Sequence, residues 1–555
     1  MAKENKHPKG LAVLFFTEMW ERFGFYLMLG IFTLYMIGGA SEAFPGLDFS
    51  DEKAADIYGT YLALVYLTPF FGGLLADRIL GYRKSITIGG VLMGMGYIGL
   101  SFHSETIFYI SLLFIIIGNG FFKPNISALV GRLYDNEKYR PLKDSGFNIF
   151  YMGINVGAFV SNFVAAYLRI NYGWGWAFAA AGIGMFVGLI WFWSGQSYAK
   201  EIREADYTTP AGPDDMSLTS IVMKLFVPAV IAGLAGWFIP GTIFGANSTD
   251  AFLFFSIPII IFYINLVRSA PADEKEPIKA LLSVMAVVVI FWAIFHQNGS
   301  ALTIWAERYT EREVPAWMED ATTTLSFNQV VTTTDRERVE KGAHGVPVLD
   351  ESGNPKTSMG PDPYFDNIPK EAWPKSGETK LFSTELFQSI NPGFIIIFTP
   401  LVVGFFGFLS RRKKEPSTPA KIGIGLLITA LSALVMVAAV IATGNGAVKA
   451  SAGWLFGTYA VITVGELFLS PMGLSLVSKL SPPRIVALMM GGWFLSTSLG
   501  NKLSGVLSGL WNFYDNKAYF FLTNTLLAML AVVGIFILLP WLRRVVDEHK
   551  ANTEK

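Results

Sequence analysis

The segment GGLLADRILGYRK, residues Gly72 to Lys84, lies between two long apolar stretches of the chain. Its glycines allow two helices to approach each other closely, and Asp77 is placed to cap a helix or to pair with a neighbouring arginine. Arg78, Arg83 and Lys84 make the segment basic, which is typical of a short cytoplasmic loop in a membrane protein. The segment therefore predicts a turn between two membrane-spanning helices.

The composition also indicates an integral membrane protein. The chain has 555 residues, of which 52% are hydrophobic and only 15% are charged, unlike the usual soluble globular protein. Lys plus Arg and Asp plus Glu both number 43, so the net charge gives no reason to expect a nucleic acid as partner. The chain has no cysteine, which excludes disulfides, thiolate metal sites and cysteine nucleophiles.

Stretches of about 20 apolar residues are long enough to cross the hydrocarbon core of a lipid bilayer. The chain contains about fourteen of them, and the seventh and eighth are the weakest. The first is too long and too interrupted for a cleaved signal peptide, so we expect it to be helix 1. The expected spans are residues 11–38, 55–76, 84–102, 107–131, 145–169, 174–195, 218–240, 250–268, 278–306, 385–410, 420–443, 452–478, 484–511 and 518–543.

The short loops predict the orientation, because loops rich in Lys and Arg stay in the cytoplasm. Every even-numbered span is followed by such a loop, for example by RRKK, Arg411 to Lys414, after the tenth. We therefore expect a multi-pass protein of the cell (inner) membrane with both termini in the cytoplasm. The one long polar segment, residues 310–384, then lies outside. We expect it to be a polar cap, with a small folded module as the alternative.

The first span contains TEMWERFGFY, in which Glu18, Glu21 and Arg22 share one helical face that Tyr26 continues a turn later. Charged side chains are costly inside a bilayer, so they face the bundle interior and usually mark ion or substrate pathways. Two carboxylates against one guanidinium leave an excess charge that a proton can relieve. We expect the three charged residues to take part in proton coupling. A structural cluster that joins helix 1 to a neighbour is the alternative.

Lys123 is the one charged residue in the apolar part of the fourth span, where it needs a carboxylate partner or must lose its proton. Glu466 is the only acidic residue of the twelfth span and is therefore the best candidate partner. We expect both to take part in proton coupling and in substrate binding. A permanent structural ion pair is the alternative.

Neutral polar and aromatic residues complete the predicted pocket. Tyr66 in the second span, Gln297 and Asn298 in the ninth and Asn391 in the tenth offer donors and acceptors suited to amides and chain termini. The fifth span carries Asn148, Asn155 and Asn162 at intervals of seven, and for the first and last we expect contacts between helices. The pocket wall on the C-terminal side is assigned to Trp493, Phe494 and Thr497.

Several of these stretches resemble known signatures. GGLLADRILGYRK is similar to the signature loop of the major facilitator superfamily, G-x-L-a-D-r-x-G-r-k. Within that superfamily the chain resembles the proton-dependent oligopeptide transporter family, and the likeness extends over nearly the whole chain apart from residues 310–384. The matching stretches are Glu18 to Tyr26 (E-x-x-E-R-F-x-x-Y), GNGFFKPN at Gly118 to Asn125, FYMGINVG at Phe150 to Gly157 and QSINPGF at Gln388 to Phe394.

The resemblance implies an all-α integral membrane protein with the major facilitator fold and about 14 transmembrane helices. Two six-helix bundles would rock around a site near the bilayer midplane. It also implies a pair between Lys123 and Glu466 across the bundles, and a substrate contact for Asn155. The expected parts are an N-terminal bundle (1–200), a linker with two extra helices (201–276), and a C-terminal bundle (277–309 and 385–555) interrupted by an extracytoplasmic insert (310–384).

The implied function is inward symport of protons with di- and tripeptides, without covalent chemistry or a cofactor. A short peptide is zwitterionic, so Arg22 and Lys123 on one side and Glu466 on the other match its two ends. Another small polar solute, such as nitrate, an amino acid or a peptide-like drug, is the alternative. A channel or an enzyme is disfavoured, because the spans show no metal cluster, nucleophile–base pair or phosphate loop.

One departure from the family pattern concerns the pocket. Several members have a second basic residue on helix 1, seven positions after the motif arginine, and pair it with an acid in the ninth span. Here these positions hold Leu29 and the run FHQNG around His296. A single partner would be an unpaired buried charge, which explains why both are missing. His296 is a candidate titratable group, and a neutral hydrogen-bonding histidine is the alternative.

Overall fold

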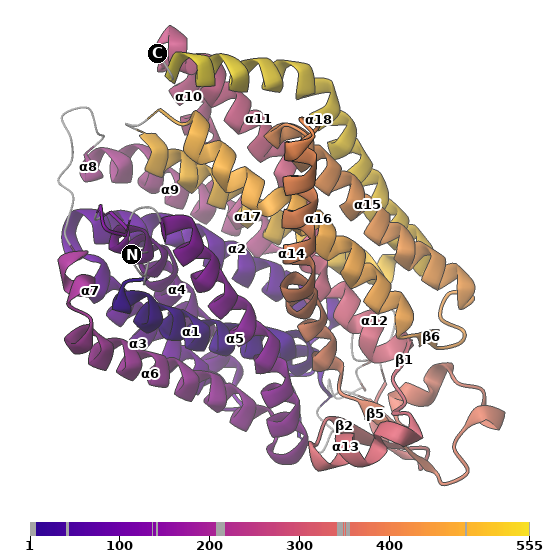
Figure 1. Ribbon diagram of the computed structural model, residues 1–555. Helices are drawn as coiled ribbons and strands as arrows, with labels where there is room; N and C mark the ends of the chain where they lie inside the picture. Colours follow the sequence, from indigo (N-terminus) through magenta and orange to yellow (C-terminus); the bar gives the residue numbers. More distant parts are fainter. Residues whose placement is uncertain are drawn as a thin grey trace.

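The computed structural model describes residues 7–39, 44–135, 137–139, 142–206, 217–340, 348, 350, 356–482 and 485–553. Six long helices form the N-terminal half, drawn in indigo and purple in Figure 1. Within this half α1 packs against α5 and α6, and α3 packs against α4 and α6. Their bounds are α1 Lys9–Ile37, α2 Asp51–Leu75, α3 Tyr82–Leu100, α4 Glu105–Leu133, α5 Lys143–Tyr172 and α6 Trp174–Tyr198.

A second group of helices forms the C-terminal half, drawn from magenta to yellow in Figure 1. In this half α15 packs against α16 and α18, and α11 packs against α17 and α18. The predicted ninth span is broken by a short 3-10 turn, η4, so that it consists of three pieces. The bounds are α11 Ala272–Phe295, η4 His296–Gly299, α12 Ala301–Tyr309, α14 Ile390–Arg411, α15 Thr418–Ala442, α16 Gly453–Leu480, α17 Val486–Gly509 and α18 Lys517–Thr553.

Between the two halves lie the short helix α7 and a pair of longer helices that cover α2 and α17 from one side. The pair packs mainly against itself, through α9 and α10, and α10 also contacts both α2 and α17. These helices occupy the predicted seventh and eighth spans. Their bounds are α7 Lys200–Glu204, α8 Leu218–Ile221, η3 Val222–Phe226, α9 Val227–Trp237 and α10 Asn247–Ser269.

In the described part of the chain, eleven helical segments are long and apolar enough to cross a membrane. The helices α1, α3 and α17 also coincide with predicted spans but are not among these eleven. One reason is that α1 carries Glu18, Glu21 and Arg22 within its apolar sequence. The membrane-spanning and mainly helical nature of the chain is thus clear, while the total of fourteen spans and the limits of the parts stay predictions.

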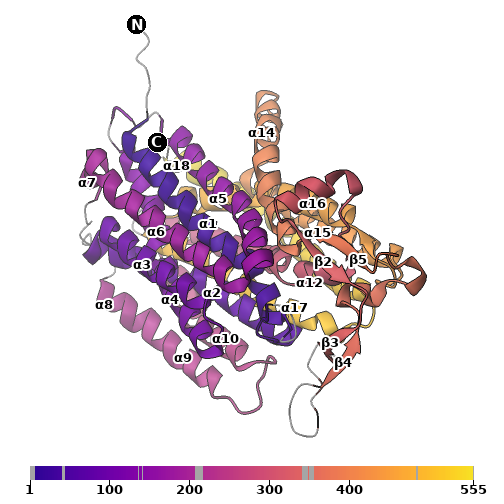
Figure 2. The same cartoon turned by 90° about the horizontal axis from the view of Figure 1, so that it is seen from below.

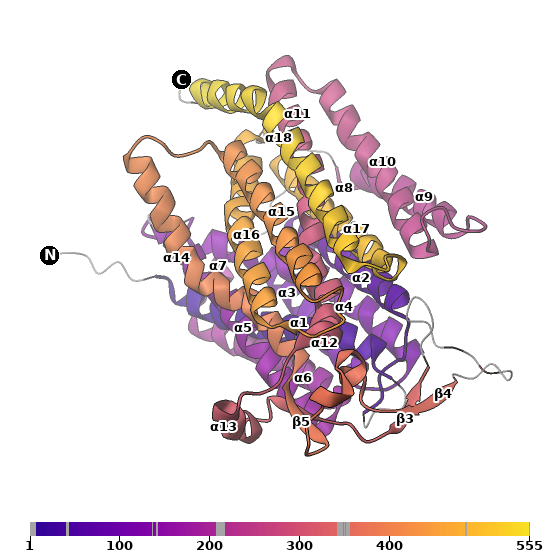
Figure 3. The ribbon, with the colours of Figure 1, turned by 90° about the vertical axis from the view of Figure 1, so that its right-hand side faces the viewer.

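The insert of residues 310–384 lies at one end of the helices and the end of α18 at the other (Figure 3). We call the end that carries the insert the insert face. The insert contains two antiparallel strand pairs, β2 with β5 and β3 with β4, and in addition β1 pairs with β6 in parallel. The strands are β1 Thr310–Glu311, β2 Asn328–Thr332, β3 Arg336–Val339, β4 Thr357–Gly360, β5 Glu378–Phe382 and β6 Ala450–Ser451, with α13 Glu319–Thr324 and 3-10 turns η5 Ala316–Met318, η7 Pro363–Asn367, η8 Lys370–Ala372 and η9 Thr384–Ser389.

The insert has a small hydrophobic core of its own, so the expectation of a mere polar cap was wrong. Val331 of β2 and Leu381 of β5 are buried against Tyr364 and Phe365. The four residues are far apart in the sequence, and the antiparallel pairing of β2 with β5 brings two of them to the same place. Figure 2 shows these two strands beside α12 and the pair β3–β4 further out.

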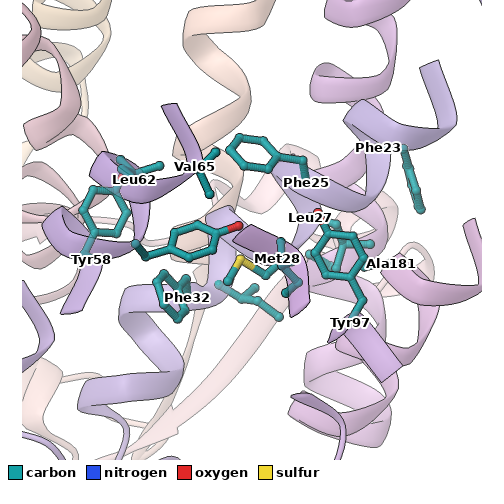
Figure 4. Packing of buried hydrophobic residues seen from close by; sticks show 14 of the residues in the cluster. Phe23, Phe25, Leu27, Met28, Phe32, Tyr58, Leu62, Val65, Tyr97 and Ala181 are labelled. Atoms are coloured by element: carbon teal, nitrogen blue, oxygen red, sulfur yellow. The ribbon is translucent and has the colours of Figure 1, made fainter. Parts of the chain in front are cut away.

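Each half has a large hydrophobic core built from helix faces. In the N-terminal half, side chains of α1 such as Phe25 and Phe32 lie among residues of α2, including Tyr58 and Leu62 (Figure 4). The rings of Phe32 and Tyr61 pack edge to face, with centroids 5.3 Å apart. Such aromatic packing fixes the position of α1, which carries the predicted charged cluster.

The two halves meet most closely where α2 crosses α17. A Cβ atom on Gly59 would lie only 2.7 Å from the Cα of Gly505, so each glycine makes room for the other backbone. Small residues at helix crossings allow close packing inside a membrane, where the hydrophobic effect does not drive helix association. Ser498 and Asn501 of α17 donate hydrogen bonds to backbone carbonyls of α2 at the same crossing.

We therefore predict that Gly59→Ala lowers the thermal unfolding temperature of the purified protein, because the added methyl group must separate α2 from α17. Overpacking of this kind costs about 1–3 kcal/mol. The matched control is Gly534→Ala in α18, where a Cβ would meet no atom within 4 Å. The control should keep or slightly raise the unfolding temperature, since alanine favours a helix. Equal effects of the two substitutions would contradict the predicted close packing.

Candidate functional site

The charged cluster of α1 is fully buried inside the N-terminal half. Glu18, Glu21 and Arg22 are only 2%, 0% and 3% exposed. Arg22 donates from Nη2 to Glu21 Oε1 at 2.6 Å, its Nε also contacts the Glu21 carboxylate, and Glu18 Oε1 lies 3.4 Å from Nε. The second oxygen of Glu18 is buried without a hydrogen-bond partner among the described residues. The cluster thus holds one fully paired acid and one acid with a free oxygen.

Lys123 of α4 lies against aromatic rings. Its Nζ is 4.0 Å from the ring centroid of Tyr66 on α2, which is the geometry of a cation–π contact. The Tyr66 ring in turn packs edge to face on His296 of η4, with centroids 5.8 Å apart. The Nδ1 atom of His296 lies 3.3 Å from the carbonyl oxygen of Trp292, so this nitrogen must carry a proton. Lys123, Tyr66 and His296 therefore form one stack that reaches from the N-terminal to the C-terminal half.

Glu466 of α16 is bound within the C-terminal half and not to Lys123. Its Oε2 accepts a hydrogen bond from Asn391 Nδ2 at 3.1 Å, and Asn391 also donates to Thr463 at 2.8 Å. The contact described for Lys123 is with Tyr66, and the one described for Glu466 is with Asn391. The predicted pair between Lys123 and Glu466 is therefore not formed in this structure. The physical reason is that each group lies in a different half, and each has other polar or aromatic contacts there.

One of the predicted amide residues, Gln297, uses its side chain for a contact within the C-terminal half. Gln297 and Asn524 of α18 exchange two hydrogen bonds, at 2.9 and 3.0 Å, and both side chains are buried. Asn298 is half-buried, and its backbone carbonyl oxygen accepts a hydrogen bond from Gln388 at 2.8 Å. The turn η4 rotates these residues relative to α11, so that Gln297 points to a neighbouring helix.

In α5, Asn155 uses its Nδ2 to donate to the carbonyl of Tyr151 one turn earlier, at 2.9 Å. Its carbonyl oxygen is left for another partner. Asn162 donates to Ser389 at 3.1 Å and so joins α5 to η9, as expected for a contact between helical segments. The side chain of Asn148 lies outside the part of the chain that the structure describes.

The residues predicted to form the pocket wall on the C-terminal side mostly pack against their own half. Trp493 is 3% exposed and lies so close to Gly473 of α16 that a Cβ there would overlap its ring. Thr497 donates back to the Trp493 carbonyl at 3.3 Å, and Phe494 is partly buried in the core of the C-terminal half. Tyr26 of α1 is half-buried and continues the face of the charged cluster.

Three ion pairs join the two halves at the insert face, and the sequence analysis missed them. Asp51 and Arg308 lie at helix ends, where a charge looks like an ordinary surface residue. Lys502 could have been recognised from the sequence as a buried charge that needs a partner, because it is a lysine inside an apolar span. The pairs are Arg169 of α5 with Glu385 of η9 (2.7 and 3.0 Å), Arg308 of α12 with Asp51 of α2 (2.6 and 2.8 Å), and Lys502 of α17 with Asp56 of α2 (2.5 Å).

Comparison with known families agrees with this arrangement of helices and buried charges. The sequence model of the POT family matches residues 83–319 and 378–546. The chain belongs to the POT family. The matched ranges leave out residues 320–377, which are most of the insert, and also residues 1–82. The resemblance found from the sequence motifs is thereby confirmed.

Known relatives of this POT family member cover nearly its whole length. It is 30% identical over 541 residues to the uncharacterized transporter YclF of Bacillus subtilis (strain 168), with 97% of this chain and 95% of the relative aligned. It is 28% identical to a di-/tripeptide transporter of Lactococcus lactis subsp. lactis (strain IL1403), with 97% of both chains aligned. Solved structures give the same result and confirm the major facilitator fold. A crystal structure of a peptide transporter POT in complex with sulfate is 29% identical, with a TM-score of 0.75 over 97% of this chain and 96% of that one.

The pairing of Gln297 with Asn524 leads to a prediction about stability. Gln297→Leu alone leaves the buried amide of Asn524 without its partner, which costs about 1–3 kcal/mol, and Asn524→Leu does the same for Gln297. We expect each single variant of the purified protein to have a lower thermal unfolding temperature. In the double variant both amides are gone, so its loss should be clearly smaller than the sum of the two single losses.

The double-mutant cycle separates a structural role of Gln297 from a role in substrate binding. The measurement is made without substrate, so that lost binding has no effect on it. Additive losses, or no loss in Gln297→Leu, would mean that the two amides do not depend on each other. Gln297 would then be assigned to substrate binding again.

Proposed function

We propose that this POT family member is a proton-coupled symporter that imports di- and tripeptides by alternating access. The observation that carries the proposal is the separation of buried charges between the halves. Arg22 and Lys123 lie in the N-terminal half and Glu466 lies in the C-terminal half, and no ion pair joins Lys123 to Glu466. Both Lys123 and Glu466 are half-buried. A zwitterionic peptide offers one charge to each side.

The proton would use the same carboxylates. Glu466 has a neutral amide as its hydrogen-bond partner, and Glu18 has a buried oxygen without one among the described residues. A carboxylate inside a membrane without a full cationic partner is stabilised by taking up a proton. Protonation of Glu466 would release a bound ammonium group, and loss of the proton would favour its return. This links proton movement to peptide movement without a cofactor or a covalent step.

The contacts between the halves indicate which side of the protein is closed. The ion pairs of Arg169, Arg308 and Lys502 all lie on the insert face. Thr33 of α1 also donates to the carbonyl of Gly299 at 2.6 Å, between the halves. With the insert outside and both termini in the cytoplasm of the inner membrane, as the basic loops predict, these contacts would close the external side of the protein.

Proton-driven uptake into liposomes tests the role of Glu466. Glu466→Gln keeps the shape of the side chain and an oxygen that accepts from Asn391, but it cannot take up a proton. We expect accumulation of a radiolabelled dipeptide, driven by a pH gradient, to fall to the level of protein-free liposomes. Exchange of labelled for unlabelled dipeptide should persist, because exchange needs no net proton movement.

The matched control is Glu311→Gln, which removes an exposed carboxylate of β1 and should accumulate peptide as the unchanged protein does. Accumulation by Glu466→Gln against a gradient would show that coupling runs through another group. Failure of the unchanged protein to take up any dipeptide would contradict the proposed substrate.

A second candidate function is proton-coupled transport of another small polar solute, such as nitrate, an amino acid or a peptide-like drug. Two similar POT structures support this second candidate, because one was solved in complex with alafosfalin and another in complex with 5-aminolevulinic acid. A thermal-shift screen of dipeptides against nitrate, free amino acids and these two compounds separates the candidates. Stabilisation by dipeptides but not by nitrate or amino acids is the expected result.

A further inference from the structure

The insert is firmly attached to the C-terminal half. Its first strand, β1, pairs with β6 in the loop before α16, with Thr310 opposite Ala450 and Glu311 opposite Ser451. Next to β1, Arg312 is only 1% exposed and donates to the Phe382 carbonyl at 2.7 Å, on the last strand of the insert. The start and the end of the insert are thus hydrogen-bonded to each other beside α12 and α16.

A second set of contacts fixes the insert to the same half. Lys449, in the loop before β6, donates to the carbonyl of Arg308 at 2.5 Å, and its Nζ lies 4.3 Å from the ring centroid of Tyr364 in the core of the insert. Glu307 of α12 forms an ion pair with Arg312 at 3.3 Å and accepts a hydrogen bond from Thr384. These bonds lie within the C-terminal half and its insert, so they need not break when the halves rock.

Among the described residues, the insert and the adjoining turn η9 make several contacts with the N-terminal half at the end of α5. Arg169 of α5 donates to both oxygens of Glu385 and, through Nη2, to Gln329 of β2 at 3.2 Å. Glu385 is fully buried, so the guanidinium of Arg169 is the charge that makes its burial possible. One arginine thereby connects a helix of the N-terminal half to two segments that move with the C-terminal half.

Weaker contacts surround this arginine. The ring of Phe163 on α5 packs on Phe327 of the insert, with centroids 5.3 Å apart. Ser326 lies 3.5 Å from Asn171, between the side-chain oxygens. Behind these contacts a cavity of 980 Å³ lies between the insert and the helix ends, and Arg169 and Gln329 are among its lining residues. Water in this cavity can hydrate the charged groups when the contact opens.

We propose that the insert is an external strap that closes the insert face: it is carried by the C-terminal half and fastened reversibly to α5 through Arg169. The inference rests on the proposed alternating-access function, because the strap must be released when the insert face opens to receive substrate. It assigns a gating role to Phe327 and Gln329 of the insert and to Glu385, which directly follows the insert. Arg169, Glu385 and Gln329 are the positioning residues of this gate.

Disulfide cross-linking tests the strap directly, because the natural chain has no cysteine. Asn171→Cys with Ser326→Cys places two thiols across the gate. The matched control, Glu311→Cys with Ser451→Cys, places two thiols between the exposed paired residues of β1 and β6, where the insert joins its own half. Both proteins are reconstituted in liposomes, oxidised or treated with a short bifunctional thiol reagent, and assayed for dipeptide uptake before and after reduction.

We expect the cross-linked gate pair to lose uptake to the level of protein-free liposomes and to regain it on reduction. The cross-linked control should transport as it does when reduced. Unchanged uptake by the fully cross-linked gate pair would overturn the strap. Absence of uptake in both reduced proteins and in the unchanged chain would overturn the proposed function instead, so the two failures are distinguishable.

Removal of both charges gives a second test that does not depend on cross-linking. Arg169→Gln removes the cation from the buried Glu385, and Glu385→Gln in the same chain removes the unpaired acid. We expect the double variant to label faster than the unchanged protein with a membrane-impermeant thiol reagent at a cysteine placed at Ser389, because its gate opens more often. An unchanged labelling rate would contradict a gate held by the Arg169 pair.

Discussion

The cost of placing a charge inside a lipid bilayer is the constraint on which this structure depends. Each buried charge must be neutralised, hydrated or hydrogen-bonded, and the way this is done decides which parts of the protein can separate. In the N-terminal half, Arg22 is neutralised by Glu18 and Glu21 of its own helix. In the C-terminal half, Glu466 is held by Asn391. Arg22 is thus neutralised within its own helix, whereas Glu466 is hydrogen-bonded by a neutral amide of its own half.

At the insert face, in contrast, charged groups of one half are paired with charged groups of the other. There the ion pairs of Arg169, Arg308 and Lys502 connect one half to the other or to a segment that the other half carries. Asp51 and Arg308 lie at helix ends, whereas Lys502 and Glu385 are buried, with exposures of 1% and 0%. Lys502 also contacts Ser248 of α10 at 3.1 Å, which extends the closed face to the inserted helical pair. The ion pairs at the insert face are thus contacts that can break when the halves separate. The charges near the midplane are the proposed sites for the proton and the substrate.

The sequence predicted the helices and the buried cluster of α1 because both depend on local patterns. Apolar length predicts a span, and the spacing of Glu18, Glu21 and Arg22 predicts a shared face. The contacts of Gln297 could not be predicted, because η4 interrupts the helix and the periodicity no longer tells which way a side chain points. The cross-half pairs depend on tertiary placement of helix ends. The core of the insert depends on strand pairing between residues about fifty positions apart, which the alternation of so few residues does not reveal.

The replacement of a family charge pair by Leu29 and His296 changes how the midplane charges can be handled. A second cation on helix 1 would compete with Lys123 for the carboxylates of the cluster and would need its own acid in the C-terminal half. Here Lys123 of the N-terminal half rests on Tyr66, whose ring touches His296 of the C-terminal half. A cation–π contact is worth about 0.5–2 kcal/mol, less than a buried ion pair, so it holds an ammonium group without fixing it there. Lys123 is therefore stabilised while Glu466 is distant and remains free to leave the ring when a carboxylate, from the protein or from a peptide terminus, comes within reach.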